Sequence, residues 1–65
     1  MKYLIRVVWT IKGEEVESTV KRTKYIEIAE AFFKNYSILM EIAPILEIKR
    51  VSLYEDGYEI ERRIK

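Results

Sequence analysis

The chain lacks cysteine and histidine, which removes the side chains most used for metal binding and nucleophilic catalysis. Without them there is no disulfide, no zinc-thiolate site and no Ser-His or Cys-His dyad. The remaining candidates are acidic pairs, and we assign Glu14-Glu15 to a turn and Glu59/Glu61 to a charged strand face. We therefore expect a protein that is not an enzyme, with no metal and no cofactor.

Long apolar runs are also lacking: no segment of about 18 apolar residues and no signal-peptide cleavage pattern is present, so we expect a cytoplasmic protein without a membrane contact. Twelve Lys and Arg oppose 11 Asp and Glu, a net charge of +1 that disfavours a non-specific nucleic-acid coat protein. Gln is absent while Glu, Lys, Arg and Ile are abundant, which is typical of thermophile proteins.

Glycine is scarce, and the two glycines mark two predicted β-hairpins. Gly13 and Gly57 each lie between two strand-like segments of alternating apolar and polar residues. Asp56-Gly57 favours a type I′ turn, because both central residues of that turn need positive φ. At Gly13 we predict a two-residue loop, either Lys12-Gly13 or Gly13-Glu14, since both place Val16 and Val20 on the apolar face of the first strand.

The Asp56-Gly57 turn fixes a predicted register for the C-terminal hairpin. It sets three cross-strand pairs: Glu55 with Tyr58, Leu53 with Ile60, and Val51 with Arg62. The helix-facing side would then carry Val51, Leu53, Tyr58, Ile60, Arg62 and Ile64. The solvated side would carry Ile48, Arg50, Ser52, Tyr54, Glu59, Glu61 and Arg63.

Between the hairpins, apolar residues recur with a helical period. They stand at positions 25, 28, 29, 32, 33 and 36, which predicts a helix over about residues 24–36. Thr23 is the expected N-cap, and Pro44 ends any helix that precedes it. Residues 37–44 either prolong this helix or form a packed connection. Trp9 is expected in the core against Phe32 or Phe33.

Hairpin, helix and hairpin predict an α+β fold of ββαββ type, with residues 1–65 as a single domain. A four-stranded sheet is formed by the two hairpins, and the helix packs across one face. Two strand orders keep the crossover right-handed: 2-1-3-4, and the β-grasp order 2-1-4-3. We favour 2-1-3-4, because Arg62 on the helix side reaches water from an edge strand.

Two segments resemble known small proteins. "AEAFFKNY" is similar to the helix of the immunoglobulin-binding domains of streptococcal protein G, which implies the same β-grasp layout. Glu30 and Lys34 match that family's binding face in type, whereas Ala31 and Ile38 replace its polar contact residues, which argues against antibody binding. "VSLYEDGYEI" is similar to the final hairpins of small phage and prophage proteins, which implies a viral or mobile-element source.

The first strand carries apolar residues on both faces, which indicates a binding surface on the sheet face that the helix leaves open. The predicted partner-binding residues are Leu4, Arg6, Val8, Ile48, Arg50 and Tyr54. We predict a protein-binding or regulatory module, with a protein partner or a second copy (a homodimer) on this face. The alternative is a nucleic-acid-binding protein that uses Tyr54, Arg6 and Arg50.

Overall fold

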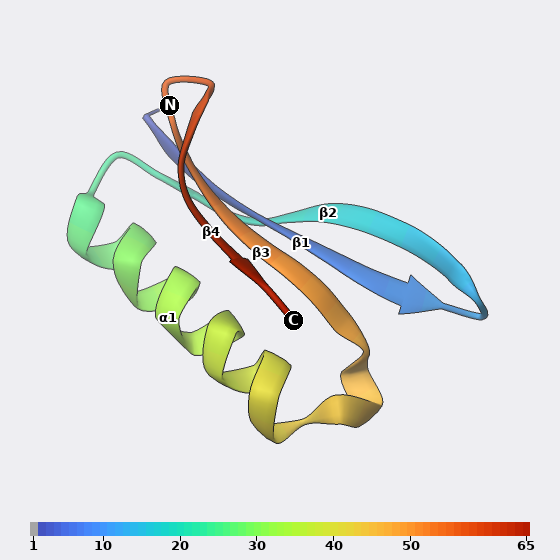
Figure 1. Ribbon diagram of the computed structural model, residues 1–65. Coiled ribbons are helices and arrows are strands. Elements are labelled where there is room, and N and C mark those ends of the chain that lie inside the picture. The colour runs from blue at the N-terminus through green and yellow to red at the C-terminus, as the bar shows by residue number, and fades with distance from the viewer. Residues whose placement is uncertain (1) are drawn as a thin grey trace.

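Residues 2–65 are described by a computed structural model, in which one helix covers one face of a four-stranded sheet (Figure 1). The elements are β1 (Tyr3–Ile11), β2 (Glu14–Thr23), α1 (Ile26–Ile42), the 3₁₀ turn η1 (Pro44–Leu46), β3 (Ile48–Glu55) and β4 (Tyr58–Ile64). All neighbouring strands are antiparallel, in the order β2-β1-β3-β4. The predicted α+β fold is confirmed, with the first of the two predicted strand orders.

Both hairpins turn through the two-residue loops that the sequence predicts. The φ angles are positive at all four central positions: Lys12 52°, Gly13 82°, Asp56 50° and Gly57 87°. Positive φ at both central residues is the requirement of a type I′ turn, whose twist matches that of the strands. Val16 therefore lies opposite Trp9, on the helix side.

Three β-bulges interrupt the pairing, and each moves the following side chains to the other face. The unpaired residues are Val20 in β2, Lys49 in β3 and Ile60 in β4. The bulge at Lys49 corrects one prediction: Ile48 lies opposite Trp9 and is a core residue, 1% exposed, and it does not reach the open face. A one-residue shift has this effect because side chains alternate between faces with a period of two.

The bulge at Ile60 corrects the predicted register of β4. Leu53 pairs with Glu61 and Val51 pairs with Arg63, so the pairs predicted with Ile60 and Arg62 are wrong. Ser52 pairs with Arg62, and Arg50 pairs with Ile64. The side chains of these two pairs lie on the face of the sheet that the helix leaves open. β4 is an edge strand as we favoured, but Arg62 on the helix side was the wrong reason for it.

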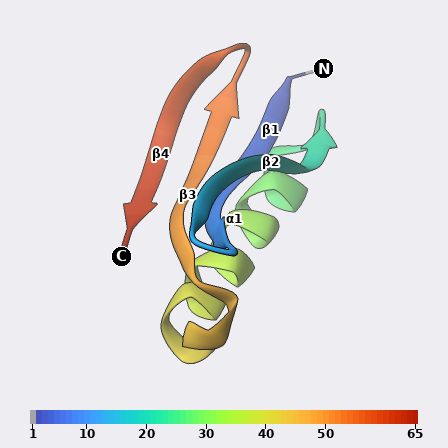
Figure 2. The ribbon, with the colours of Figure 1, turned by 90° about the vertical axis from the view of Figure 1, so that its right-hand side faces the viewer.

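The core lies between α1 and the three strands β1, β2 and β3, whereas β4 is at the edge of the sheet and contacts the helix mainly through the ion pair of Arg63 with Glu41 (Figure 2). The buried apolar residues of the core are Tyr3, Ile5, Val7, Ala29, Met40, Ile48, Val51 and Leu53, with Trp9, Phe32 and Phe33 packed against them.

The helix α1 extends to Ile42, so residues 37–42 prolong the predicted helix. Its N-cap is Tyr25, whose N–H donates to the Thr23 hydroxyl at 3.1 Å, so the prediction of Thr23 as N-cap is wrong.

Candidate functional site

The open face of the sheet consists of three rows of side chains that cross all four strands. From β2 to β4 the rows are Arg22, Leu4, Tyr54 and Glu59; then Thr19, Arg6, Ser52 and Arg62; then Glu17, Val8, Arg50 and Ile64. We call these twelve residues the open face. Five of the six predicted partner-binding residues lie in it, all except the buried Ile48.

Arginine and lysine are segregated in this molecule. Four of the five arginines belong to the open face, and none of the seven lysines stands in its three rows. A planar guanidinium binds carboxylates through two parallel hydrogen bonds, whereas an ammonium acts as a point charge without this fixed geometry. The open face therefore carries the type of cation that is suited to directed contacts.

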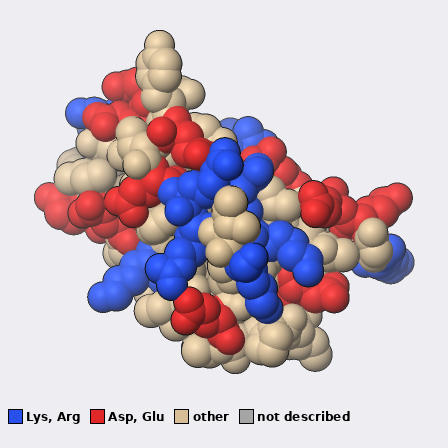
Figure 3. Space-filling model, in the orientation of Figure 1, with Lys and Arg blue, Asp and Glu red and all other residues tan. Residues whose placement is uncertain are grey.

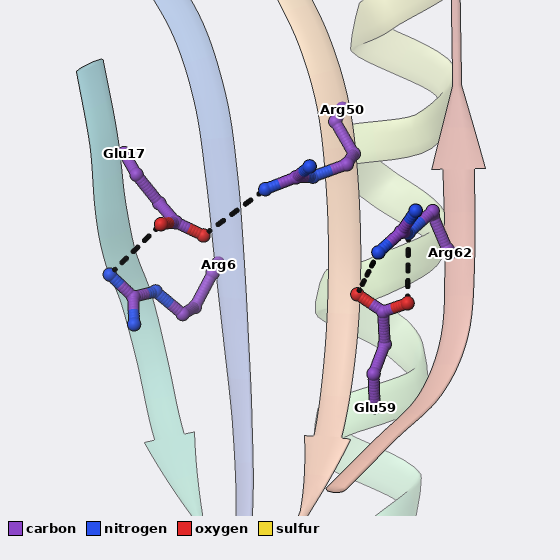
Figure 4. Close-up of polar contacts among 5 residues, drawn as sticks. All are labelled: Arg6, Glu17, Arg50, Glu59 and Arg62. Carbon is purple, nitrogen blue, oxygen red and sulfur yellow. Dashed lines mark hydrogen bonds and ion pairs between the residues drawn. The ribbon is translucent and has the colours of Figure 1, made fainter. Parts of the chain in front are cut away.

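A bridge of arginine and glutamate side chains lies over the apolar residues of the open face. The Glu17 carboxylate of β2 forms ion pairs with Arg6 at 3.4 Å and with Arg50 at 3.5 Å, and the Arg50 side chain reaches across β1 to form its pair (Figure 4). Val8 is the β1 residue between Glu17 and Arg50 in the same row, so this ion pair spans it. The bridge explains why Val8 is half-buried although α1 lies on the other side of the sheet.

Both arginines of the bridge keep a buried Nε–H without an acceptor. Four buried side-chain polar atoms in residues 2–65 have no hydrogen-bond partner: Arg6 Nε, Arg50 Nε, Ser52 Oγ and Trp9 Nε1. Three of these four belong to the open face. The Ser52 hydroxyl is close enough to Glu59 to favour its charged form, yet no hydrogen bond between them meets normal geometric limits. Unpaired buried donors are rare in folded proteins, and they cluster here on one surface.

Glu59 and Arg62 form a second ion pair on the open face. The Arg62 Nη2–H donates to one carboxylate oxygen of Glu59 at 3.2 Å, and the Arg62 Nε lies 2.8 Å from the other (Figure 4). Residues three apart in a regular strand point to opposite faces, so the bulge at Ile60 makes this pair possible. The Arg62 guanidinium holds the pKa of the Glu59 carboxyl below the ordinary value for glutamate.

This lowered pKa predicts a local pH response. Because the folded-state pKa of Glu59 lies below its unfolded value, the pair stabilises the fold above the unfolded pKa of about 4.3, and this is lost as the pH falls through the folded pKa. We expect Arg62→Gln to raise the pKa of Glu59 in a carboxyl-carbon NMR titration, and the control Arg63→Gln to leave it unchanged. An unchanged pKa in Arg62→Gln would show that the pair does not form in solution.

The sequence reasoning missed the outer parts of the open face. Arg22 and Arg62 enter it only because of the bulges at Val20 and Ile60, which no alternating pattern reveals. No signal in the sequence marks these two arginines, because strict alternation would place both of them on the helix side. Figure 3 shows Lys and Arg side chains gathered over β4 and the C-terminal end of the chain, at the rim of this surface.

A groove of about 430 Å³ lies between α1 and β4, on the other side of the sheet. Phe33, Ser37 and Ile38 line it together with the ion pair of Glu41 and Arg63, whose charged atoms are 2.6 Å apart.

Within residues 2–65 no group of three acidic side chains is placed to hold a metal ion. No helix in this part of the chain is long and apolar enough to cross a membrane.

Comparison with known proteins found no matching protein-family model, no matching curated protein and no matching solved structure.

Proposed function

We propose that this chain is a small, non-catalytic protein-binding module whose open face recognises an acidic surface of its partner. One observation carries the proposal: Arg6 and Arg50, on neighbouring strands, each keep a buried Nε–H without an acceptor, on a face whose cations are all arginine. Carboxylates are the acceptors that guanidinium groups bind best. Arginine and tyrosine, here with Tyr54, also dominate the binding energy of many protein interfaces.

The charges of the open face favour a different protein over a second copy. Its rows hold four arginines and two glutamates, so two copies face to face would bring surplus positive charge together.

The residues of the open face also favour a protein partner over a nucleic acid. Glu17 and Glu59 repel phosphates, and Tyr54 is the single aromatic residue in the three rows, where a stacking platform needs several.

Glu17 occupies the place that a partner's carboxylate would take. It already bridges Arg6 and Arg50, and the ion pairs are long and about one-third exposed, so they contribute little to stability. A partner that offers acidic side chains can displace Glu17 and reach the unpaired Nε–H groups. The proposal therefore predicts that Glu17→Gln strengthens partner binding while Arg6→Gln/Arg50→Gln weakens it.

The test is a quantitative affinity pull-down from lysate of the source organism, with wild type and these variants as baits. Loss of two arginine contacts at the centre of an interface is expected to lower recovery of a true partner by about tenfold or more. Arg63→Gln is the matched control, because Arg63 lies on the helix side of β4. It is expected to recover as much partner as wild type, and Glu17→Gln to recover more.

Two results would contradict the proposal. The first is a set of recovered proteins whose amounts do not change between wild type and Arg6→Gln/Arg50→Gln. The second is a tight gel shift with single-stranded or duplex DNA or RNA at about 150 mM salt that the double variant loses and Arg63→Gln keeps. That second result would establish nucleic-acid binding through Tyr54, Arg6 and Arg50.

A regulatory role for a virus or mobile element of a hot environment, in the cytoplasm, completes the proposal. It is supported by the similarity of the C-terminal hairpin to those of phage proteins and by a composition rich in Glu, Lys and Ile.

A further inference from the structure

The side of α1 that faces away from the sheet carries a second apolar surface. Its residues are Ile28, Ala31, Asn35, Ile38 and Ile42, at alternating spacings of three and four, and all of them are exposed. The opposite side of the helix, with Ala29 and Met40, packs on the sheet (Figure 1). We call the five exposed residues the outer seam.

The exposure of the outer seam rises toward the C-terminal end of the helix. Ile28 is 40%, Ile38 is 44% and Ile42 is 71% exposed, and Ile45 in η1 continues the surface at 90%. Single exposed isoleucines are common on protein surfaces. A series at three-four spacing is different, because this spacing places the residues along one line where a second helix packs.

Charged residues flank the outer seam on one side only. Glu27, Lys34 and Glu41 stand seven residues apart, so their signs alternate along the helix. Within residues 2–65, Lys34 has no ion-pair partner, whereas Glu41 is held by Arg63 and remains exposed. On the other flank, Phe32 and Leu39 turn toward the core.

We propose that the outer seam pairs with the outer seam of a second copy, as two antiparallel helices related by a two-fold axis. When Asn35 lies opposite Ile38 of the second copy, Ala31 lies opposite Ile42. The same register brings Lys34 next to Glu41 of the second copy, twice by symmetry. Parallel helices would place Lys34 beside Leu39 and form no ion pair.

The paired helices form the centre of a four-layer dimer with the two sheets outside. The open faces stay uncovered, so this inference does not depend on the proposed function, and one dimer would present two binding faces. Asn35 is the single polar residue of the seam, and such a residue lowers affinity but fixes the register. A seam of one 17-residue helix is smaller than a standard interface of about 800 Å² per partner, so we expect a weak dimer.

Sedimentation and light scattering between about 10 μM and about 1 mM test the dimer. The mass of wild type is expected to rise from 7.8 kDa toward twice that value. Lys34→Glu and Glu41→Lys should each keep the mass at the monomer value, because each brings like charges together. The combined variant Lys34→Glu/Glu41→Lys should dimerise again. Arg63→Gln controls for the loss of the pair between Arg63 and Glu41, and should dimerise like wild type.

Disulfide cross-linking tests the antiparallel direction, because the natural chain has no cysteine. Ala31→Cys mixed with Ile42→Cys should give a mixed disulfide on oxidation, while Ile42→Cys alone should give none. Circular dichroism checks that every variant keeps the wild-type helix signal.

Three outcomes would overturn the inference. They are a monomer mass for wild type at the highest concentration, a dimer that persists in Lys34→Glu, and a disulfide in Ile42→Cys alone with none in the mixture. A partner lost in the pull-down of Arg6→Gln/Arg50→Gln has no bearing on these results, since those residues lie on the opposite side of the sheet.

Discussion

Replacing Ile48 with lysine is expected to unfold the protein, whereas replacing Val8 with lysine leaves it folded. Ile48 is 1% exposed among the residues of the core, so the variant loses a large buried side chain, which costs about 2–5 kcal/mol, and buries an unpaired charge as well. A 65-residue domain has a total stability of about 3–10 kcal/mol, on the order of this loss.

Val8 differs because it lies on the open face, beneath an ion pair that is partly exposed. A lysine there can extend its ammonium group past Glu17 into water, so we expect a change of less than about 1 kcal/mol. Far-UV circular dichroism and thermal melting of the two variants measure the difference. If the two variants respond alike, Val8 and Ile48 share a face and the bulge at Lys49 does not exist. If Val8→Lys unfolds and Ile48→Lys melts like wild type, the two faces of the sheet are exchanged.

The hairpins were predictable because their signals are local. Asp56-Gly57 and Lys12-Gly13 supply the positive φ of type I′ turns, and this requirement acts on two residues whatever the rest of the fold does. The helix was predictable by its period up to Tyr36. Beyond it, "SILMEI" has three consecutive apolar residues, which fit a helix or a packed connection, and burial of Met40 and Ser37 against the sheet identifies it as helix. The buried Ser37 hydroxyl donates to the Phe33 carbonyl at 2.8 Å.

The bulges were not predictable because the residues in them look like ordinary strand residues. Val20 and Ile60 fit the alternating pattern of their strands. Lys49 departs from it, because strict alternation would place its charge on the face of Val51 and Leu53, but a charged residue near the start of a strand is not specific for a bulge. What decides the bulges is the whole sheet: the shift at Lys49 buries Ile48, and the shift at Ile60 joins Glu59 to Arg62. The candidate site was therefore found at its centre, with Leu4, Arg6, Val8, Arg50 and Tyr54, and missed at both edges.

These bulges also bear on how the open face is used. A flat edge strand invites pairing with other chains, and a bulge twists it away from such contacts. β4 combines a bulge with four charged residues, so its backbone is protected although all of its side chains are exposed. Partner contacts are then directed to the side chains of the open face and of the outer seam.

Replacing Gly57 with valine is expected to lower the free energy of unfolding by about 1–3 kcal/mol. The φ angle of Gly57 is +87°, and a Cβ atom at this position would meet nothing within 4 Å. The loss therefore comes entirely from the backbone, because a β-branched residue disfavours positive φ. In a domain of this size each kcal/mol lowers the melting temperature by about 4–8 °C.

Gly57→Asn is the matched control, since asparagine tolerates the left-handed region far better than valine. We expect its melting temperature to lie between those of wild type and Gly57→Val, and the order of the three should hold in urea as well as in heat. Because the side chain at position 57 has open space around it, a steric clash cannot produce this order. Equal melting of all three proteins would mean that the loop between β3 and β4 does not need positive φ at Gly57, and that its type I′ geometry is wrong.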